Sequence, residues 1–178
     1  MKRIKNIVIA VLAAASAMSA NQAFAAAGSV NFTGNILDSA CDVALESQNQ
    51  VVVLGDYYKT EFPATGAKTA AKKFDIVLKN CPVTVSNAKV RFDGTPDTSN
   101  SSLLAIDTSV PGAATGVAIN LMTADKADLP LHGGNSYTYL LNSSSANTLT
   151  FYAQYISTAA AVTAGPANSV ANFSVVYN

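Results

Sequence analysis

Charged residues are scarce in this sequence, and several side chains that carry out chemistry are nearly absent. Only 12% of the 178 residues are charged, there is no tryptophan, and there is one histidine. A chain with so little charge must either bury much of its surface or be protected while it folds. Both requirements fit a subunit of a larger assembly.

The few basic residues argue against a nucleic-acid partner. Without the first 25 residues, the chain has 8 basic and 11 acidic residues, a net charge of about −3. It has no basic patch with interleaved aromatic residues, which is the usual signature of nucleic-acid binding. We therefore expect no nucleic-acid partner.

Candidate catalytic and metal-binding residues are equally few. His132 precedes Gly133 and Gly134, as a turn residue would. Sequence order leaves a Ser-His-Asp triad open, but no G-x-S-x-G elbow accompanies it. The aspartates show neither a paired-carboxylate nor a metal-ligand spacing. We expect no enzymatic activity, no metal site and no cofactor.

The N-terminus has the pattern of a secretory signal peptide. Residues 1–5 are basic, residues 7–17 are apolar, and Ala23-Phe24-Ala25 is an A-x-A cleavage pattern. We expect residues 1–25 to be removed, and the alternative is an uncleaved membrane anchor. No later apolar stretch is long enough to span a bilayer, so the mature chain is not expected to cross a membrane.

Two cysteines, Cys41 and Cys81, remain after export. In an oxidising compartment a lone pair of cysteines favours one disulfide. It would close a loop of about 40 residues and stabilise the fold by about 4 kcal/mol in the chain-entropy model. The alternatives are two free thiols, or a metal site that only His132 could join.

Short apolar or alternating runs recur along the body and are separated by turn residues. Such runs, with almost no helical periodicity, predict an all-β antiparallel sandwich. One helix-like stretch, residues 65–73, predicts at most one or two turns. The expected strands are residues 51–54, 74–78, a pair or a bulged strand over 83–92, and residues 117–122, 137–141 and 149–155.

The last fourteen residues predict a half-buried strand with an unprotected edge. Period-two alternation places four residues on one face, namely Ala171, Phe173, Val175 and Tyr177. No proline or charged residue follows Pro166, although exposed strand edges are normally blunted, covered or paired. Since the chain ends one residue after Tyr177, we expect a strand from elsewhere to pair with this edge.

The N-terminus of the mature chain has a similar pattern. Val30, Phe32 and Ile36 share one face, and Gly34 occupies the remaining position of that face. Two strand-like ends without partners predict head-to-tail pairing between molecules, which gives an open filament when the contact does not close into a ring.

Several of these segments together resemble the pilin subunits of chaperone–usher fimbriae, the type 1 pilus family of Gram-negative bacteria. The resemblance covers essentially all of the mature chain. Its most specific part is a glycine fourteenth from the end, alternating apolar residues and a penultimate tyrosine. The segments that carry it are residues 31–36 leading into Cys41, Cys81 after the strand at 74–78, residues 149–155, and Gly165 with Phe173, Val175 and Tyr177.

The resemblance implies an immunoglobulin-like sandwich that lacks its last strand and is completed by a donor strand from another subunit. Residues 26–37 would be the donor-strand extension and residues 38–178 the incomplete pilin domain. A periplasmic pilus chaperone would fill the groove first. At the outer-membrane usher, the extension of a neighbouring pilin subunit would replace it. The implied function is that of a structural subunit of an extracellular fimbrium.

The resemblance also assigns roles to residues at both ends. Val30, Phe32 and Ile36 would fill pockets, each contributing roughly 1.5–3 kcal/mol when fully buried. Gly34 would face a shallow pocket, although a β-bulge or a turn also explains it. Gly165, Phe173, Val175 and Tyr177 would form the groove strand that the chaperone and usher recognise. The alternative for the last strand is an ordinary place in a complete sandwich.

A fimbrial subunit that also binds a host carbohydrate is the alternative function. Tip adhesins of this family carry a separate lectin domain, for which the mature chain has no room. A shallow sugar site on the pilin body, using Tyr137 or Tyr139, stays open at this point, although aromatic residues on strands are more often part of the core.

Overall fold

The computed structural model describes residues 28–34, 36, 40–134 and 137–177. The chain divides into two units, residues 1–36 and the body of residues 37–178. The predicted signal peptide and its cleavage site lie outside the described residues. Within the described residues, no helix has the length and apolar character needed to cross a membrane.

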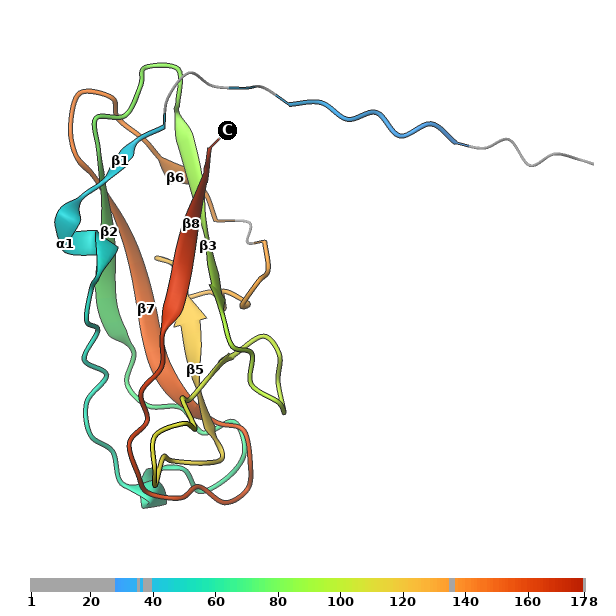
Figure 1. Ribbon diagram of the computed structural model, residues 1–178, viewed down its shortest axis with the longest axis vertical. Helices are drawn as coiled ribbons and strands as arrows, with labels where there is room; N and C mark the ends of the chain where they lie inside the picture. The colour runs from blue at the N-terminus through green and yellow to red at the C-terminus, as the bar shows by residue number, and fades with distance from the viewer. Residues whose placement is uncertain (1–27, 35, 37–39, 135–136, 178) are drawn as a thin grey trace, which may run out of the picture. The chain divides into compact units, whose positions relative to one another are not determined.

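The body consists of two antiparallel sheets that face each other (Figure 1). One sheet has five strands in the order β1-β2-β7-β5-β4, and the other has three in the order β6-β3-β8. This architecture confirms the predicted all-β sandwich. The strands are β1 (Asp42–Val43), β2 (Lys72–Lys79), β3 (Asn87–Gly94), β4 (Leu104–Ala105), β5 (Val117–Met122), β6 (Tyr139–Leu140), β7 (Asn147–Ser157) and β8 (Ala171–Tyr177).

The strand register follows from the alternation of apolar residues. In β3, Ala88, Val90 and Phe92 are buried between the sheets, and the residues between them face outward. The register is strongly specified, because a slip of one residue would turn all three apolar side chains toward solvent.

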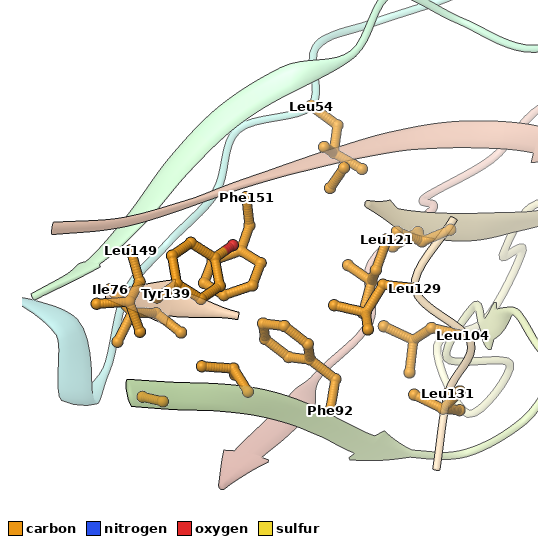
Figure 2. Packing of buried hydrophobic residues seen from close by; sticks show 14 of the residues in the cluster. Leu54, Ile76, Phe92, Leu104, Leu121, Leu129, Leu131, Tyr139, Leu149 and Phe151 are labelled. Atoms are coloured by element: carbon orange, nitrogen blue, oxygen red, sulfur yellow. The ribbon is translucent and has the colours of Figure 1, made fainter. Parts of the chain in front are cut away.

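Aromatic rings meet at the centre of the core. Phe151 of β7 is fully buried and packs edge-on against Phe92 of β3, with 5.3 Å between ring centroids. Tyr139 of β6 lies 5.2 Å from Phe151 and Phe74 of β2 lies 5.6 Å from it. Figure 2 shows the Phe151, Phe92 and Tyr139 rings together between the ribbons of the two sheets. Offset and edge-on ring pairs of this kind stabilise a core beyond the area that they bury.

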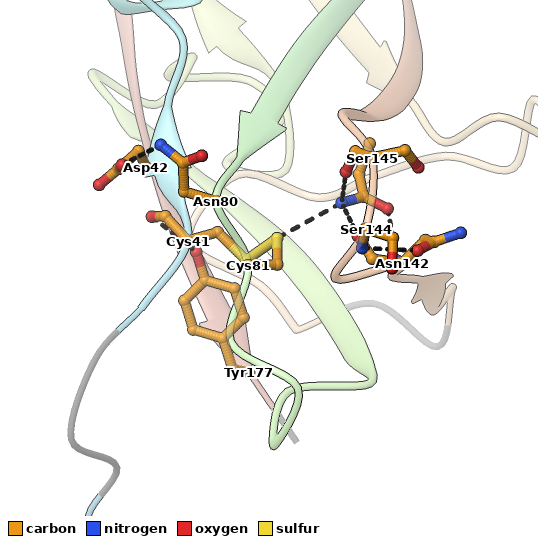
Figure 3. Close-up of a disulfide and its surroundings, with 9 residues drawn as sticks. Cys41, Asp42, Asn80, Cys81, Asn142, Ser144, Ser145 and Tyr177 are labelled. Atoms are coloured by element: carbon orange, nitrogen blue, oxygen red, sulfur yellow. Dashed lines mark hydrogen bonds between the residues drawn. A yellow bond between two sulfur atoms is a disulfide. The ribbon is translucent and has the colours of Figure 1, made fainter.

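A disulfide joins Cys41, just before β1, to Cys81, just after β2 (Figure 3). The Asn147 side-chain amide donates a hydrogen bond to the Cys81 sulfur at 3.4 Å. The predicted disulfide is confirmed, and the readings as free thiols or as a metal site are wrong. Among the described residues, no group of His, Cys, Asp and Glu could hold a metal ion.

Residues 129–132 connect the two sheets along one side of the sandwich. The Leu129 amide donates to the Leu121 carbonyl of β5, and the His132 amide donates to the Phe92 carbonyl of β3, each at 2.9 Å. His132 has a positive φ of 57°, and its Nδ1 lies 2.9 Å from an Asp93 carboxylate oxygen. His132 is therefore a turn residue that closes this side of the sandwich, as the sequence indicated.

Residues 65–73 form no helix, which lies within the predicted limit of one or two turns. The Gly66 amide donates to the Ser157 carbonyl at 2.8 Å and the Thr69 amide to the Tyr155 carbonyl at 3.0 Å. Pairing with β7 has overridden the weak helix propensity of an alanine- and lysine-rich stretch. The helical turns in the described chain are instead α1 (Leu45–Gln48) and the 3₁₀ turn η1 (Lys59–Glu61).

The strand predictions for residues 83–92 and 51–54 also differ from the structure. The Val85 amide donates to the Pro82 carbonyl at 3.1 Å, so a turn occupies this part of the chain and β3 starts only at Asn87. Residues 51–54 do not form a strand at all. Their apolar pattern reflects burial of alternate side chains, because Val52 is half-buried and Leu54 is buried.

Candidate functional site

The last strand, β8, is paired on one side only. It runs antiparallel to β3 from Ala88↔Tyr177 to Gly94↔Ala171, and it is the outermost strand of its sheet. Its residues alternate between half-buried and exposed, with Phe173 and Val175 packed against the core. The predicted half-buried last strand is confirmed, and among the described strands none pairs with its other edge.

The chain leading into β8 is held by β4 and by the loop that follows it. The Ala114 amide donates to the Pro166 carbonyl at 2.9 Å, and the Asp107 amide donates to the Asn168 carbonyl at 2.8 Å. The Ser169 hydroxyl donates to the Ala105 carbonyl at 2.6 Å. Residues 163–177 thus form one continuous rim, which we call the β8 rim.

Gly165 is required in this rim by the close approach of two backbones. A Cβ atom at this position would overlap the Gly112 carbonyl oxygen and would lie 2.8 Å from the Ala114 nitrogen. No side chain can be placed there unless the loop moves away. The sequence pattern marks Gly165 as unusual, but only the structure shows that its partner is the backbone at residues 112–114.

A second rim faces the β8 rim and consists of residues 49–57. Val52 and Leu54 point inward, whereas Val51 and Val53 are 85% and 75% exposed. The backbone of residues 50–55 makes no hydrogen bond to another strand within the described chain. The sequence reading missed this rim, because an apolar run predicts burial and does not show whether the backbone is paired.

An apolar groove lies between the two rims. Its larger part has a volume of about 790 Å³, and a smaller part of about 470 Å³ adjoins it beside residues 162–168. No charged side chain lines the larger part, whereas Asp56 and Lys59 line the smaller one. The floor of the larger part is made by Phe74, Ile76, Ile119, Leu121 and Ala153.

Two tyrosines fix the β8 rim near its two ends. The Tyr177 hydroxyl donates to the Cys41 carbonyl at 3.4 Å, beside the disulfide (Figure 3), and the Tyr155 hydroxyl donates to the Ala167 carbonyl at 2.9 Å. Burial raises the pKa of both hydroxyls, so both stay protonated donors at neutral pH. With an apolar floor and unpaired backbone on both rims, the groove suits an extended strand.

The predicted donor residues belong to the N-terminal unit. Val30, Phe32 and Ile36 are 75%, 92% and 101% exposed, and a Cβ atom on Gly34 would meet nothing within 4 Å. Residues 28–34 and 36 form no strand. Their predicted role as a donor strand therefore stays a prediction.

The two tyrosines considered for a sugar site are engaged in the core. Tyr139 is buried and donates a hydrogen bond to the Thr150 carbonyl at 2.6 Å. The Tyr137 ring packs against it with 4.7 Å between centroids. This arrangement uses both rings for packing and does not favour the carbohydrate-binding alternative.

A comparison with known families agrees with this geometry, since the family described as Fimbrial protein matches residues 30–178. The chain belongs to the Fimbrial protein family. The probable major fimbrial subunit LpfA of Escherichia coli O157:H7 is 39% identical over 177 residues, which cover 97% of each chain. The type-1 fimbrial protein A chain of Escherichia coli K12 is 36% identical, over 98% of this chain and 99% of that protein.

Solved structures of fimbrial proteins share the fold. A subunit from the structure of a chaperone–usher pilus superposes with a TM-score of 0.65 at 28% identity, over 85% of this chain and 96% of that one. The chain is thus a subunit of a chaperone–usher fimbria with the immunoglobulin-like pilin fold. It is a structural protein of extracellular fimbriae of Gram-negative bacteria and not an enzyme, as the sequence predicted.

Proposed function

We propose that this fimbrial subunit polymerises by donor-strand exchange, in which residues 26–37 of one copy fill the groove of the next. The observation that carries this proposal is the groove itself, with unpaired backbone on both rims and an apolar floor. An added strand would form backbone hydrogen bonds with the rims, and its alternate side chains would enter the groove. The N-terminal unit has the matching alternation and three exposed apolar side chains.

Burial of those side chains would supply the driving force. Val30, Phe32 and Ile36 would each contribute roughly 1.5–3 kcal/mol when fully buried. Ordering of the extension offsets part of this gain. Gly34 fits a point where the donor backbone lies directly against the groove wall, since it has no side chain to accommodate.

Two accessory partners follow from the same geometry. A periplasmic pilus chaperone would cover the groove after export, and an outer-membrane usher would then pass the subunit to its neighbour. We propose that Gly165, Phe173, Val175 and Tyr177 form the surface that both recognise, because they shape the β8 rim. The proposed domains are a signal peptide (1–25), a donor extension (26–37) and an incomplete pilin domain (38–178).

Thermal unfolding of a rearranged chain tests this function. Residues 28–37 are removed from the N-terminus and attached after Asn178 through a flexible linker, and the product is compared with the body alone. We expect the attached strand to raise the melting temperature by tens of degrees and to give a monomer. The matched control carries Phe32→Asp in the attached strand and should lose most of this gain. A body that is already stable, and that the strand does not change, would show that the sandwich is complete without a donor.

A further inference from the structure

The inward-facing row of β7 has a gap at Ala153. Phe151 and Tyr155, two residues away on either side, carry rings, whereas Ala153 carries a single methyl group. Ala153 pairs with Lys72 on one side and with Leu121 on the other, so it lies in the middle of its sheet. It lines the larger part of the groove. The short side chain of Ala153 therefore leaves a hollow in the floor of the groove, which we call the hollow above Ala153.

Three aromatic rings from three strands line the same part of the groove. They belong to Phe74 of β2, Phe92 of β3 and Phe173 of β8. The Phe74 and Phe92 rings meet at 72° with 6.0 Å between centroids, and the Phe92 and Phe173 centroids lie 6.3 Å apart. We call these three residues the aromatic triad. Aromatic surroundings of this kind favour a further ring, which can pack edge-on or offset against them.

Residues 26–37 contain one aromatic residue, Phe32, whose side chain is 92% exposed. We propose that the Phe32 ring of a second copy inserts into the hollow above Ala153 and packs against the aromatic triad. This assignment rests on the proposed donor-strand function and adds the register of the added strand. The shorter side chains of Val30 and Ile36 would leave part of the hollow empty, and empty volume in a core is destabilising.

The assignment specifies which residues of the donor enter the groove. A shift of one residue would turn Phe32 away from the groove altogether. A shift of two residues would put Val30 or Gly34 above Ala153, and neither side chain could reach the aromatic triad as Phe32 does. Phe32 and Ala153 thus form a large-and-small pair that determines the register between two subunits.

A size-exchange experiment tests this pair. The mature chain is refolded with a fluorescent peptide of residues 28–37 in excess, and capture is followed by fluorescence anisotropy. Ala153→Leu should weaken capture of the unaltered peptide by roughly fivefold to a hundredfold, because overfilling a packed site costs about 1–3 kcal/mol. A peptide with Phe32→Ala should bind the Ala153→Leu chain more tightly than the unaltered peptide does. The matched control is Thr148→Leu, on the exposed face of β7, which should leave capture unchanged.

A second measurement tests the assignment even if the Ala153→Leu chain does not fold. In the complex of the unaltered chain with its peptide, nuclear Overhauser contacts are expected between the Phe32 ring protons and the Ala153 methyl group. Contacts from Val30 or Ile36 to that methyl group would overturn the assignment. Rescue of the Ala153→Leu chain by Val30→Ala or Ile36→Ala peptides, and not by Phe32→Ala, would overturn it too. Either result leaves donor-strand exchange intact, whereas failure of the unaltered chain to capture any peptide would refute donor-strand exchange itself.

Discussion

The hydroxyl of Tyr177 donates a hydrogen bond to the carbonyl oxygen of Cys41, with 3.4 Å between the oxygens. The two residues are 136 positions apart in the chain. The end of the last strand is thereby attached to a residue near the start of the body. Because Cys41 is itself bonded to Cys81, this contact joins β8 to a covalently fixed point.

We expect Tyr177→Phe to lower the free energy of unfolding by about 0.5–1.5 kcal/mol, the usual net value of one hydrogen bond. Because the two oxygens are as far apart as 3.4 Å, we expect a loss near the lower end of this range. Urea unfolding of the refolded mature chain measures it. Tyr152→Phe is the matched control, because Tyr152 lies on the outer face of β7 and should have little effect. Equal losses for both variants would mean that the contact with Cys41 does not hold the strand.

Gly165→Ala should destabilise the β8 rim, because the added methyl group overlaps the Gly112 carbonyl oxygen. We expect a loss of about 1–3 kcal/mol in the free energy of unfolding, as for other overpacked sites. Peptide capture should weaken as well, since residues 162–168 line the smaller part of the groove. Gly134→Ala is the control, because a Cβ atom there meets nothing within 4 Å. A Gly165→Ala chain as stable as the unaltered chain would contradict the close approach.

Loss of the disulfide should lower the free energy of unfolding by about 4 kcal/mol, because the bond closes a loop between residues 40 positions apart. The paired substitution Cys41→Ser with Cys81→Ser, compared with the oxidised chain in urea, measures this loss. The unaltered chain unfolded in the presence of a reductant should give a similar value. A difference below about 1 kcal/mol would show that the unfolded chain gains little freedom when the bond is removed.

The contact between Asp93 and His132 should make part of the stability depend on pH. The hydrogen bond from His132, with the nearby Arg91 charge, holds the pKa of the Asp93 carboxyl below its usual value. A lowered folded pKa means that the stabilisation is present above the unfolded pKa, about 3.9. It is then lost as the pH falls through the folded pKa.

The comparison of the unaltered chain with Asp93→Asn measures this effect. We expect Asp93→Asn to be less stable in urea at pH 7 and the difference to shrink below about pH 4, where the carboxyl takes up a proton. Asp97→Asn, in the loop after β3, is the control. A difference that stays constant down to pH 2 would show that the charge of Asp93 has no part in the contact.

A strand could be predicted from the sequence where its residues alternate between the core and the solvent. The alternation at residues 171–177 is visible because one face packs on the core and the other meets solvent. The residues alone predict only an unpaired edge of this strand, and the groove itself was implied by the family resemblance. Its second rim and its floor could not be expected, because Val52 and Ala153 come together only through the tertiary fold.

Local composition was a poor guide in two places. It predicts a strand at residues 51–54, which is wrong, and it allows one or two helical turns at residues 65–73, where none forms. Whether a backbone is paired depends on what lies beside it, which local composition does not report. For residues 66–69 the deciding neighbour was β7, and for residues 51–54 the described body provides none.

The disulfide also determines how the body would respond to mechanical tension. A force applied through the N-terminal extension reaches Cys41 before the rest of the cross-linked body, since the extension precedes this residue in the chain. The bond to Cys81 passes that force directly to the end of β2, a strand whose pairing with β7 spans seven residue pairs. The force is therefore carried by the disulfide and not by the hydrogen bonds of the short β1, which pairs with β2 at only two positions.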